Sequence, residues 1–484
     1  MALAVPATKP NRILAVLCAA CILSAIMLTL ITPLVGQLPR LLNTTTSNAA
    51  WVVTATLLSS AVSTPIAGRL GDICGKRRVL LICLVPIAVG SVVCALSASV
   101  VPMIVGRGLQ GMGLGVIPLS ISILRDVLPD DRLGFGIASA SAAMGVGVAL
   151  GLPISAAVAE YGSWHYMFWG AGVLTAVVAV IVAIGVPADG GQGTKHGFDL
   201  VGALGLGGAV VCLLLGISKG PSWGWNSGAV LGLFAATVAL LVLWGLWELR
   251  CSDPIVDLRV TRKPPVLLTN VAGILLGFAM YVQLLVVPQI LQLPASTGYG
   301  LEQSLLSVGI LLAPAGLMTL AMSPIVPRMS AAYSPKTTLV TGSLILAAGY
   351  ASYLALSDSI LGLLMVTSLC GAGSGLAYGV LGALIMEAVP RSQTAAATSL
   401  NTLMRTAGSA IASASTAVLL SEMVVQFGGQ DLPSENGFRT AMLVGCAGAL
   451  AAAAVAAAIP SGRRKSTATV TGSKSSDELV SARV

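Results

Sequence analysis

The stretch GRLGDICGKRR, Gly68 to Arg78, decides the fold. Five of its eleven residues are charged, in a chain that is only 9% charged and 56% hydrophobic. Soluble domains carry about 25% charged residues, so this chain has too few to cover a surface in water. Apolar runs of about 18 residues or more recur on both sides of the stretch, and each is long enough to cross a bilayer as a helix. The sequence therefore predicts an all-α polytopic membrane protein.

The apolar runs, divided at charges and at Gly/Pro clusters, predict fourteen membrane helices. The first run has no cleavage-like end, so we expect it to be retained and not removed as a signal peptide. The expected helices are 13–37, 49–68, 79–98, 100–124, 135–159, 164–187, 199–218, 228–248, 266–290, 304–326, 337–356, 360–387, 396–424 and 440–460.

Lys and Arg are distributed unequally between the two sides of these helices. With both termini in the cytoplasm, the inner segments hold 21 of them and the outer loops hold 3. Cytoplasmic loops are enriched in Lys and Arg. We therefore expect a multi-pass protein of the plasma (cell) membrane with both termini cytoplasmic.

The chain contains an internal duplication. Pro, Ile and Arg within 65–69 recur within 324–328, and GMGLG at 111–115 recurs as GAGSG at 371–375, at offsets of 259 and 260 residues. Such parallel halves around a midplane cavity are typical of secondary transporters, in which rocking exposes the cavity to each side in turn. The predicted regions are a cytoplasmic N-terminus 1–12, a six-helix half 13–187, an inserted two-helix region 188–265, a second six-helix half 266–460 and a disordered cytoplasmic tail 461–484.

The charged stretch is predicted to lie in the short cytoplasmic loop between the second and third helices. We expect Asp72 to accept hydrogen bonds from helix-end N–H groups or from an arginine, as a latch that breaks when the halves rock. The basic residues are expected to hold the third helix at the anionic leaflet, and the glycines to permit a tight turn and close helix approach. A plain positive-inside anchor is the alternative. The predicted latch comprises Gly68, Arg69, Asp72, Gly75, Lys76, Arg77 and Arg78.

This stretch resembles the loop signature of the major facilitator superfamily, Gly-x-Leu-x-Asp-x-x-Gly-(Arg/Lys)-(Arg/Lys). A second family signature, an Arg followed by Gln-Gly-x-Gly, is filled by Arg107, Gln110, Gly111 and Gly113. With fourteen helices, the chain is similar to the drug:proton antiporter branch, in particular to actinobacterial multidrug and antibiotic exporters. The resemblance implies rocker-switch export of small hydrophobic organic compounds, giving antibiotic resistance or self-resistance, driven by proton entry.

Two family motifs are altered. The antiporter motif that closes the fifth helix reads GVALGLPISA, in which Gly147 and Gly151 match and Pro153 comes one place late. We expect these small residues to pack closely against the other half. In the first helix, the family's acidic position is Leu30. An uncoupled facilitator or a dedicated metabolite exporter of the same fold is therefore the alternative function.

Proton coupling needs a group that gains and loses a proton as access alternates. No carboxylate lies at mid-depth in the predicted helices, and the candidates for coupling are Arg107, Glu160 and Glu302. Both acids are expected at the outer side, where each is alternatively an ordinary solvated helix-end group. Arg107 is alternatively a structural arginine bonded to backbone carbonyls. His165 is expected to be an interfacial residue.

Two arginines and no acid inside the helices favour a substrate that is neutral or acidic and not dicationic. Polar side chains within membrane helices also join helices by hydrogen bonds, which is the alternative role for each cavity candidate. The candidates for the substrate cavity are Thr29, Thr32, Gln110, Asn270, Tyr281, Gln283, Tyr378, Asn401 and Arg405.

Other classes of function are disfavoured. The net charge of +8 is spread over loops, so we expect no nucleic-acid partner, and two histidines offer no metal site. An ATP-driven pump would need a Gly-x-x-x-x-Gly-Lys-(Ser/Thr) loop, which the sequence lacks. A membrane enzyme would need a nucleophile–base pair or metal ligands. We expect a non-enzymatic monomer whose partners are its substrate, protons and the lipid bilayer, with a proton gradient in place of a cofactor.

Overall fold

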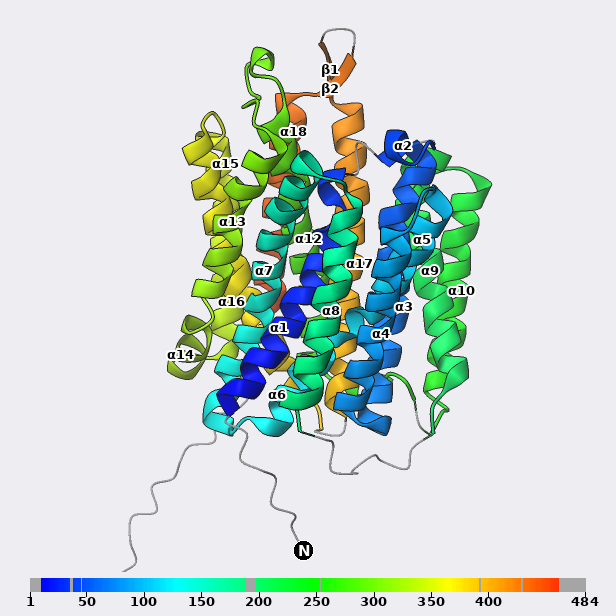
Figure 1. Ribbon diagram of the computed structural model, residues 1–484. Coiled ribbons are helices and arrows are strands. Elements are labelled where there is room, and N and C mark those ends of the chain that lie inside the picture. Colours follow the sequence, from blue (N-terminus) through cyan, green and yellow to red (C-terminus); the bar gives the residue numbers. More distant parts are fainter. Residues whose placement is uncertain are drawn as a thin grey trace, which may run out of the picture.

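The computed structural model describes residues 10–34, 38–44, 46–187, 197–252, 254–390, 393–427 and 430–460. Long helices run side by side between two ends of a bundle, with one short antiparallel strand pair (Figure 1). The first half contains α1 Pro10–Thr29, η1 Thr32–Leu34, α2 Leu38–Leu41, α3 Thr46–Cys74, α4 Lys76–Ala95, α5 Val100–Met112, η2 Gly113–Gly115, α6 Val116–Val127, α7 Asp130–Tyr161 and α8 His165–Gly185. The remainder contains α9 Leu200–Trp223, α10 Gly228–Glu248, α11 Leu258–Thr261, α12 Pro264–Gln292, η3 Ala295–Thr297, α13 Leu305–Ala321, α14 Ile325–Ala332, α15 Pro335–Leu356, α16 Ile360–Ala388, α17 Thr394–Glu422, β1 Val424–Phe427, β2 Gln430–Pro433 and α18 Glu435–Ala457.

The predicted all-helical membrane fold is confirmed. Among the described residues, 13 helices are long and apolar enough to cross a bilayer, where α5 and α6 count as one span. The fourteenth span is a bent pair, Leu306–Ala321 and Ile325–Ala332, which meet at 42°. The bend replaces the single helix expected over 304–326.

Several predicted helix limits are wrong. The first helix ends at Thr29 and not at 37, and the turn η1 follows it. The second helix continues to Cys74, beyond the expected end at 68, so Arg69 and Asp72 are helical and not in a loop. Only Gly75 separates α3 from α4, and its φ of 98° is a conformation that favours glycine.

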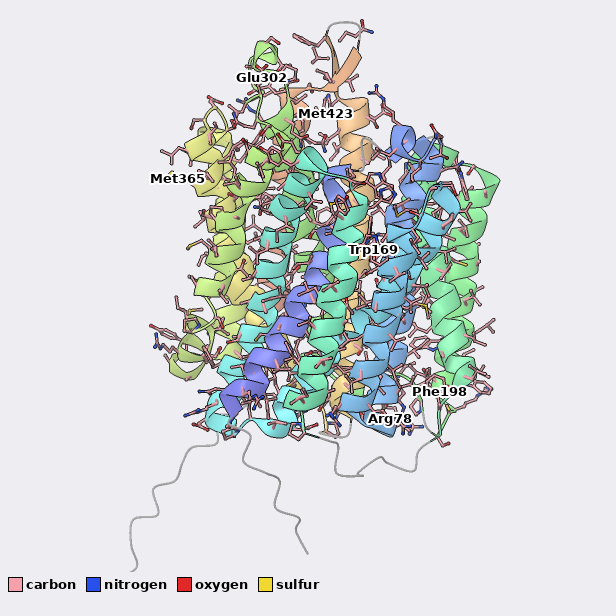
Figure 2. All side chains as sticks on the ribbon, in the orientation of Figure 1. Arg78, Trp169, Phe198, Glu302, Met365 and Met423 are labelled. Carbon is pink, nitrogen blue, oxygen red and sulfur yellow. The ribbon has the colours of Figure 1, made fainter. Side chains whose placement is uncertain are left out.

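The two ends of the bundle differ in charge. We call the end at which α1 begins the basic end, because Lys76–Arg78 start α4 there, and we call the opposite end the hairpin end, after β1 and β2 (Figure 1). Figure 2 labels Arg78 and Phe198 at the basic end and Glu302 and Met423 near the hairpin end.

Buried apolar side chains form two large clusters, one mostly from α1–α8 and the other mostly from α12–α18. The same glycine packing recurs in both. A Cβ on Gly90 of α4 would lie 2.4 Å from the Gly106 carbonyl of α5, and one on Gly342 of α15 would lie 2.9 Å from the Gly373 carbonyl of α16. The inserted helices α9 and α10 pack against each other, and α9 lies against α3 and α17.

Candidate functional site

Asp72 joins the two groups of helices at the basic end. Its Oδ1 accepts a hydrogen bond from the backbone N–H of Ala395 at 3.3 Å, and its Oδ2 accepts one from Ala396 at 3.0 Å. The first N–H groups of a helix have no partner within it, and they carry partial positive charge. Asp72 of α3 therefore binds the N-terminus of α17 as a carboxylate binds a helix dipole.

The glycine one turn earlier allows this contact. A Cβ on Gly68 would stand 2.1 Å from the Ser399 Oγ and 2.7 Å from the Ala395 carbonyl, both on α17. Any larger residue would push α3 and α17 apart.

A second polar bridge between the two groups of helices was missed by the sequence analysis. Arg125, in the last turn of α6, donates from Nη2 to the Met386 carbonyl at 2.7 Å and from Nη1 to the Thr394 Oγ1 at 2.5 Å. Nearby, Ser139 of α7 and Ser323 share a hydrogen bond of 2.9 Å. The one signal in the sequence was a charged pair, Arg125 and Asp126, at a predicted helix end.

The basic residues after Gly75 do not act as a simple lipid anchor. Lys76 is only 8% exposed, and its Nζ pairs with Asp126 of α6 at 2.5 Å. Arg77 donates to the Ala183 carbonyl at 2.5 Å, while Arg78 is exposed. The expectation that all three hold α4 at the lipid surface is therefore wrong for Lys76, because burial requires a charged partner. Arg69 is also buried and lines a cavity beside α17.

The altered antiporter motif contacts two different neighbours. A Cβ on Gly147 would meet the Ile22 carbonyl at 2.5 Å, and one on Gly151 would meet the Thr29 Oγ1 at 2.2 Å, so both glycines face α1 of their own half. This corrects the expectation that they pack against the other half. Pro153 packs against the other half instead, because a Cβ added to Gly309 of α13 would lie only 2.7 Å from the Pro153 Cα.

A polar cluster occupies the interface between α7, α12, α16 and α17. The Arg405 guanidinium lies 4.2 Å from the ring centroid of Tyr378, a cation–π contact, and its Nη2 approaches the Met144 Sδ at 3.9 Å. One turn before Arg405, Asn401 donates to the Asn270 Oδ1 at 3.0 Å. Four of the predicted cavity residues, Asn270, Tyr378, Asn401 and Arg405, therefore come together.

This cluster holds two hydrogen-bond donors without an acceptor. Arg405 Nε and Asn270 Nδ2 are buried and have no hydrogen-bond partner among the described residues. A buried donor left without a partner costs about 1–3 kcal/mol. The site is therefore suited to a ligand that supplies acceptor oxygens.

The other predicted cavity residues lie elsewhere. Gln110 donates to the Ser91 Oγ at 2.9 Å inside the first half, Thr29 is buried against α7, and Thr32 is exposed in η1. Tyr281 and Gln283 lie on α12, and neither side chain forms a hydrogen bond with the described part of the chain.

Arg107 is a buried link between helices. It is 1% exposed, and its Nη1 donates to the Met27 carbonyl of α1 at 2.9 Å and to the Gln110 Oε1 at 2.7 Å. These contacts match the alternative role of a structural arginine bonded to a backbone carbonyl, and its part in proton coupling stays a prediction.

The acidic coupling candidates lie near the hairpin end. Glu160 is exposed in the last turn of α7. Glu302 is exposed with a φ of 49°, and its Oε2 accepts from the Ala295 N–H at 3.4 Å. His165 bonds to the Ser97 carbonyl at 3.2 Å and stacks on Trp164.

Two buried acids were missed. Asp199 is 8% exposed before α9, and Glu248 is 3% exposed at the end of α10. They correct the expectation that the helices bury no acid, although both lie at the basic end and not at mid-depth. The signal was the tryptophan pair in WGLWE, which places Glu248 at a membrane interface. No three His, Cys, Asp or Glu residues in the described ranges could together hold a metal ion.

Known proteins share this sequence and fold. Residues 17–413 match the Major Facilitator Superfamily. The tetracenomycin C resistance and export protein of Streptomyces glaucescens is 29% identical over 309 residues, which cover 63% of this chain and 56% of that protein. The multidrug transporter protein MdtP of Bacillus subtilis is 25% identical over 75% of this chain and 66% of its own. The chain thus spans between about half and two thirds of the length of these relatives.

Two solved structures share the helical architecture. The human organic anion transporter MFSD10 has a TM-score of 0.64 at 15% identity, over 93% of this chain and 99% of that one. The proton:xylose symporter XylE has a TM-score of 0.62 at 16% identity, over 94% and 97%. At these identities the likeness shows the fold alone. The match over residues 17–413 confirms the resemblance drawn from the two signatures, and the chain belongs to the major facilitator superfamily of membrane transporters.

Proposed function

We propose that this transporter exports small hydrophobic organic compounds, such as antibiotics or related toxins, from the cell in exchange for protons. The names of two relatives support this, because one is a resistance and export protein and the other a multidrug transporter. The site between the halves supports it too, since apolar and aromatic surface surrounds a small number of polar groups there. Such surfaces recognise many hydrophobic compounds.

The Arg405 cluster carries the proposal about substrate charge. A fixed cation and two unfilled donors lie at the interface, and no acid lies within hydrogen-bond or ion-pair distance of Arg405 among the described residues. A neutral or acidic compound would supply the missing acceptors, whereas a dication would meet the positive charge of Arg405. The substrate is therefore neutral or anionic.

The contacts at the basic end suit alternating access. Asp72 holds the start of α17, and Arg125 holds both the start of α17 and the end of α16. Opening this end therefore requires both bridges to break. Rocking of the halves would then expose the Arg405 cluster to the cytoplasm.

Proteoliposomes with a trapped pH-sensitive dye test the proposal. With a proton gradient imposed, neutral and anionic antibiotics should cause proton flux and matched cationic compounds should not. Arg405→Gln should reduce the flux caused by anionic compounds several-fold, whereas Arg40→Gln, at an exposed site on α2, should leave it unchanged. Flux with cations alone would contradict the proposed substrate class.

An uncoupled facilitator remains the second candidate, and one observation favours it. Leu30 occupies the acidic position of the first helix and is 3% exposed, so no titratable group replaces the missing acid there. Substrate movement without proton flux would establish the facilitator. Proton flux that is lost in Glu160→Gln or Glu302→Gln would establish antiport and identify the coupling acid.

A further inference from the structure

The two inserted helices bring two buried carboxyl groups together at the basic end. Asp199 directly precedes α9, next to Phe198, which Figure 2 labels, and Glu248 is the last residue of α10. A Cβ on Gly202 would stand 2.3 Å from the Asp199 Oδ2 and 3.2 Å from the Glu248 Oε1. Both carboxyl groups therefore meet beside the first turn of α9.

The hydrogen bonds of the two carboxyl groups are unequal. Asp199 accepts from the Gly202 N–H at 2.8 Å, and the indole N–H of Trp247 lies 3.1 and 3.0 Å from its two oxygens. Glu248 accepts from the Val256 N–H at 3.3 Å, and the Ile255 N–H and the Trp244 indole N–H also lie near its carboxyl group. Its Oε2 is buried and forms no hydrogen bond with the described part of the chain. Donors favour the charged form of the acid that they contact. A negative charge is therefore supported more strongly on Asp199, whose hydrogen bonds are shorter, than on Glu248.

Val256 belongs to residues 254–263, which we call the strap. Ile255 and Val256 are 1% and 5% exposed and pack in one cluster with residues of α3, α9 and α17, among them Ala61 and Leu400. Beside them lies a cavity of about 140 Å³ between the strap, α3 and α17. The strap therefore connects Glu248 with the junction at which Asp72 binds α17.

The strap is also tied to the start of α17. Asp257 caps α11 through the N–H groups of Arg259 and Val260 and accepts from Gln393 Nε2 at 3.3 Å. Gln393 directly precedes α17, whose first turn contains the two N–H groups bound by Asp72. Movement of the strap would therefore reach the bridge between the halves.

Within the part of the chain that the structure describes, the carboxyl pair has no neutralising cation. Among the described residues, neither Asp199 nor Glu248 forms an ion pair with Lys, Arg or His. The charged groups of α17 and the far end of α9, which are Arg405, Glu422 and Lys219, lie three turns or more along their helices. Charged groups on the adjoining segments at this end are Arg69, Asp72, Arg250, Asp257, Arg259, Arg262 and Lys263. Lys195, His196 and Asp253 also belong to these segments and lie outside the described residues. Two neighbouring buried carboxylates without a cation cannot readily both be ionised.

We propose that Asp199 and Glu248 form a proton-binding site whose single proton, carried by Glu248, holds the strap against the junction of α3 and α17. Loss of that proton to water would leave two negative charges side by side. Glu248 would then turn towards water, Val256 would lose its acceptor, and the strap would detach. The proton site stands by itself, whereas its influence on opening rests on the proposed transport function.

Hydrogen exchange of the full chain in nanodiscs, without substrate, tests the proton site between pH 5 and 9. After correction for intrinsic exchange, protection of strap peptides should fall as the pH rises. Glu248→Gln, which mimics the protonated acid, should keep them protected throughout. Glu422→Gln, at an exposed acid of α17, should behave as the unchanged protein does. Protection that does not depend on pH, or an identical profile in Glu248→Gln, would overturn the proposal.

Asp199→Asn provides a second test because asparagine can still cap α9. Removal of the neighbouring negative charge should weaken proton binding at Glu248 at least tenfold. A charged Glu248 would then face no second negative charge, so strap peptides should lose less protection at high pH than those of the unchanged protein. At each pH at which the unchanged protein shows the infrared C=O band of the protonated Glu248, the Glu248→Gln variant should lack that band. The pH dependence of strap protection should not shift when sodium or potassium replaces choline in the buffer. Such a shift would overturn the proposal in favour of a cation site. None of these readouts needs substrate, so failure of transport and failure of the proton site are distinguishable.

Discussion

Asp72 and Ala396 are 324 residues apart in the chain, and their carboxylate and backbone N–H meet at 3.0 Å. A carboxylate at a helix N-terminus is stabilised both by hydrogen bonds and by the helix dipole. In the proposed rocking of the halves, the contact is present when they are closed at the basic end and is lost when they open there. It therefore stabilises one of the two states between which a rocking transporter alternates.

Asp72→Asn should loosen this contact without removing the side chain. Hydrogen bonds to charged groups contribute about 1.5–3 kcal/mol, and loss of the charge should cost about 1 kcal/mol of this. Hydrogen exchange of the first turn of α17 should become about fivefold faster. Asp131→Asn, at an exposed acid at the start of α7, should leave that exchange unchanged. Equal acceleration in both variants would show that Asp72 does not hold α17.

Arg125→Ala should act on the same helix start from the other side. Its guanidinium contacts Thr394 and the carbonyls of Met386 and Val389, so its removal takes one donor away from each of these groups. Combined with Asp72→Asn, the effect on exchange should be non-additive, because both residues hold one element. Arg132→Ala, whose side chain is exposed, is the matched control. Strict additivity would mean that the two bridges open independently.

Hydropathy predicted the membrane helices well and their ends poorly. A scan for apolar residues stops at Arg69, but backbone hydrogen bonds continue to Cys74, because charged side chains do not interrupt a helix. The end is set by Gly75, whose positive φ no hydropathy pattern records. The bend before Ile325 was missed too, because hydropathy does not record where the backbone of one apolar run changes direction.

The polar cluster was predictable along one helix and not between helices. Asn401 and Arg405 are four residues apart, so they share a face of α17. That Asn270 and Tyr378 face them depends on how α12 and α16 pack, which the sequence does not reveal. Asp199 and Glu248 escaped notice because each lies at the end of a predicted helix, where a solvated acid is the usual expectation.

The ring of Tyr378 should matter more than its hydroxyl group. Cation–π contacts contribute about 0.5–2 kcal/mol, so Tyr378→Leu should raise the KM for an anionic substrate several-fold by releasing Arg405. Tyr378→Phe keeps the ring and loses the hydroxyl group, which donates to the Leu276 carbonyl at 3.3 Å. Its KM should stay within about twofold of the original, measured as initial transport rates in proteoliposomes. A larger effect from Tyr378→Phe would assign the hydroxyl group, and not the ring, to binding.

Close packing of α12 against α17 should make one glycine irreplaceable. A Cβ on Gly408 would stand 1.9 Å from the Ile274 carbonyl, a backbone atom that cannot turn aside. Gly408→Ala should therefore force the two helices apart and cost at least about 1–3 kcal/mol, as overpacking does. Gly232→Ala on α10 is the matched control, because nothing lies within 4 Å of its added methyl group and alanine favours a helix. In detergent, thermal unfolding of Gly408→Ala should begin at a lower temperature, while that of Gly232→Ala should be unchanged or slightly higher. Unaltered unfolding of Gly408→Ala would mean that α12 and α17 can separate without loss of stability, as they would if this interface itself opens during transport.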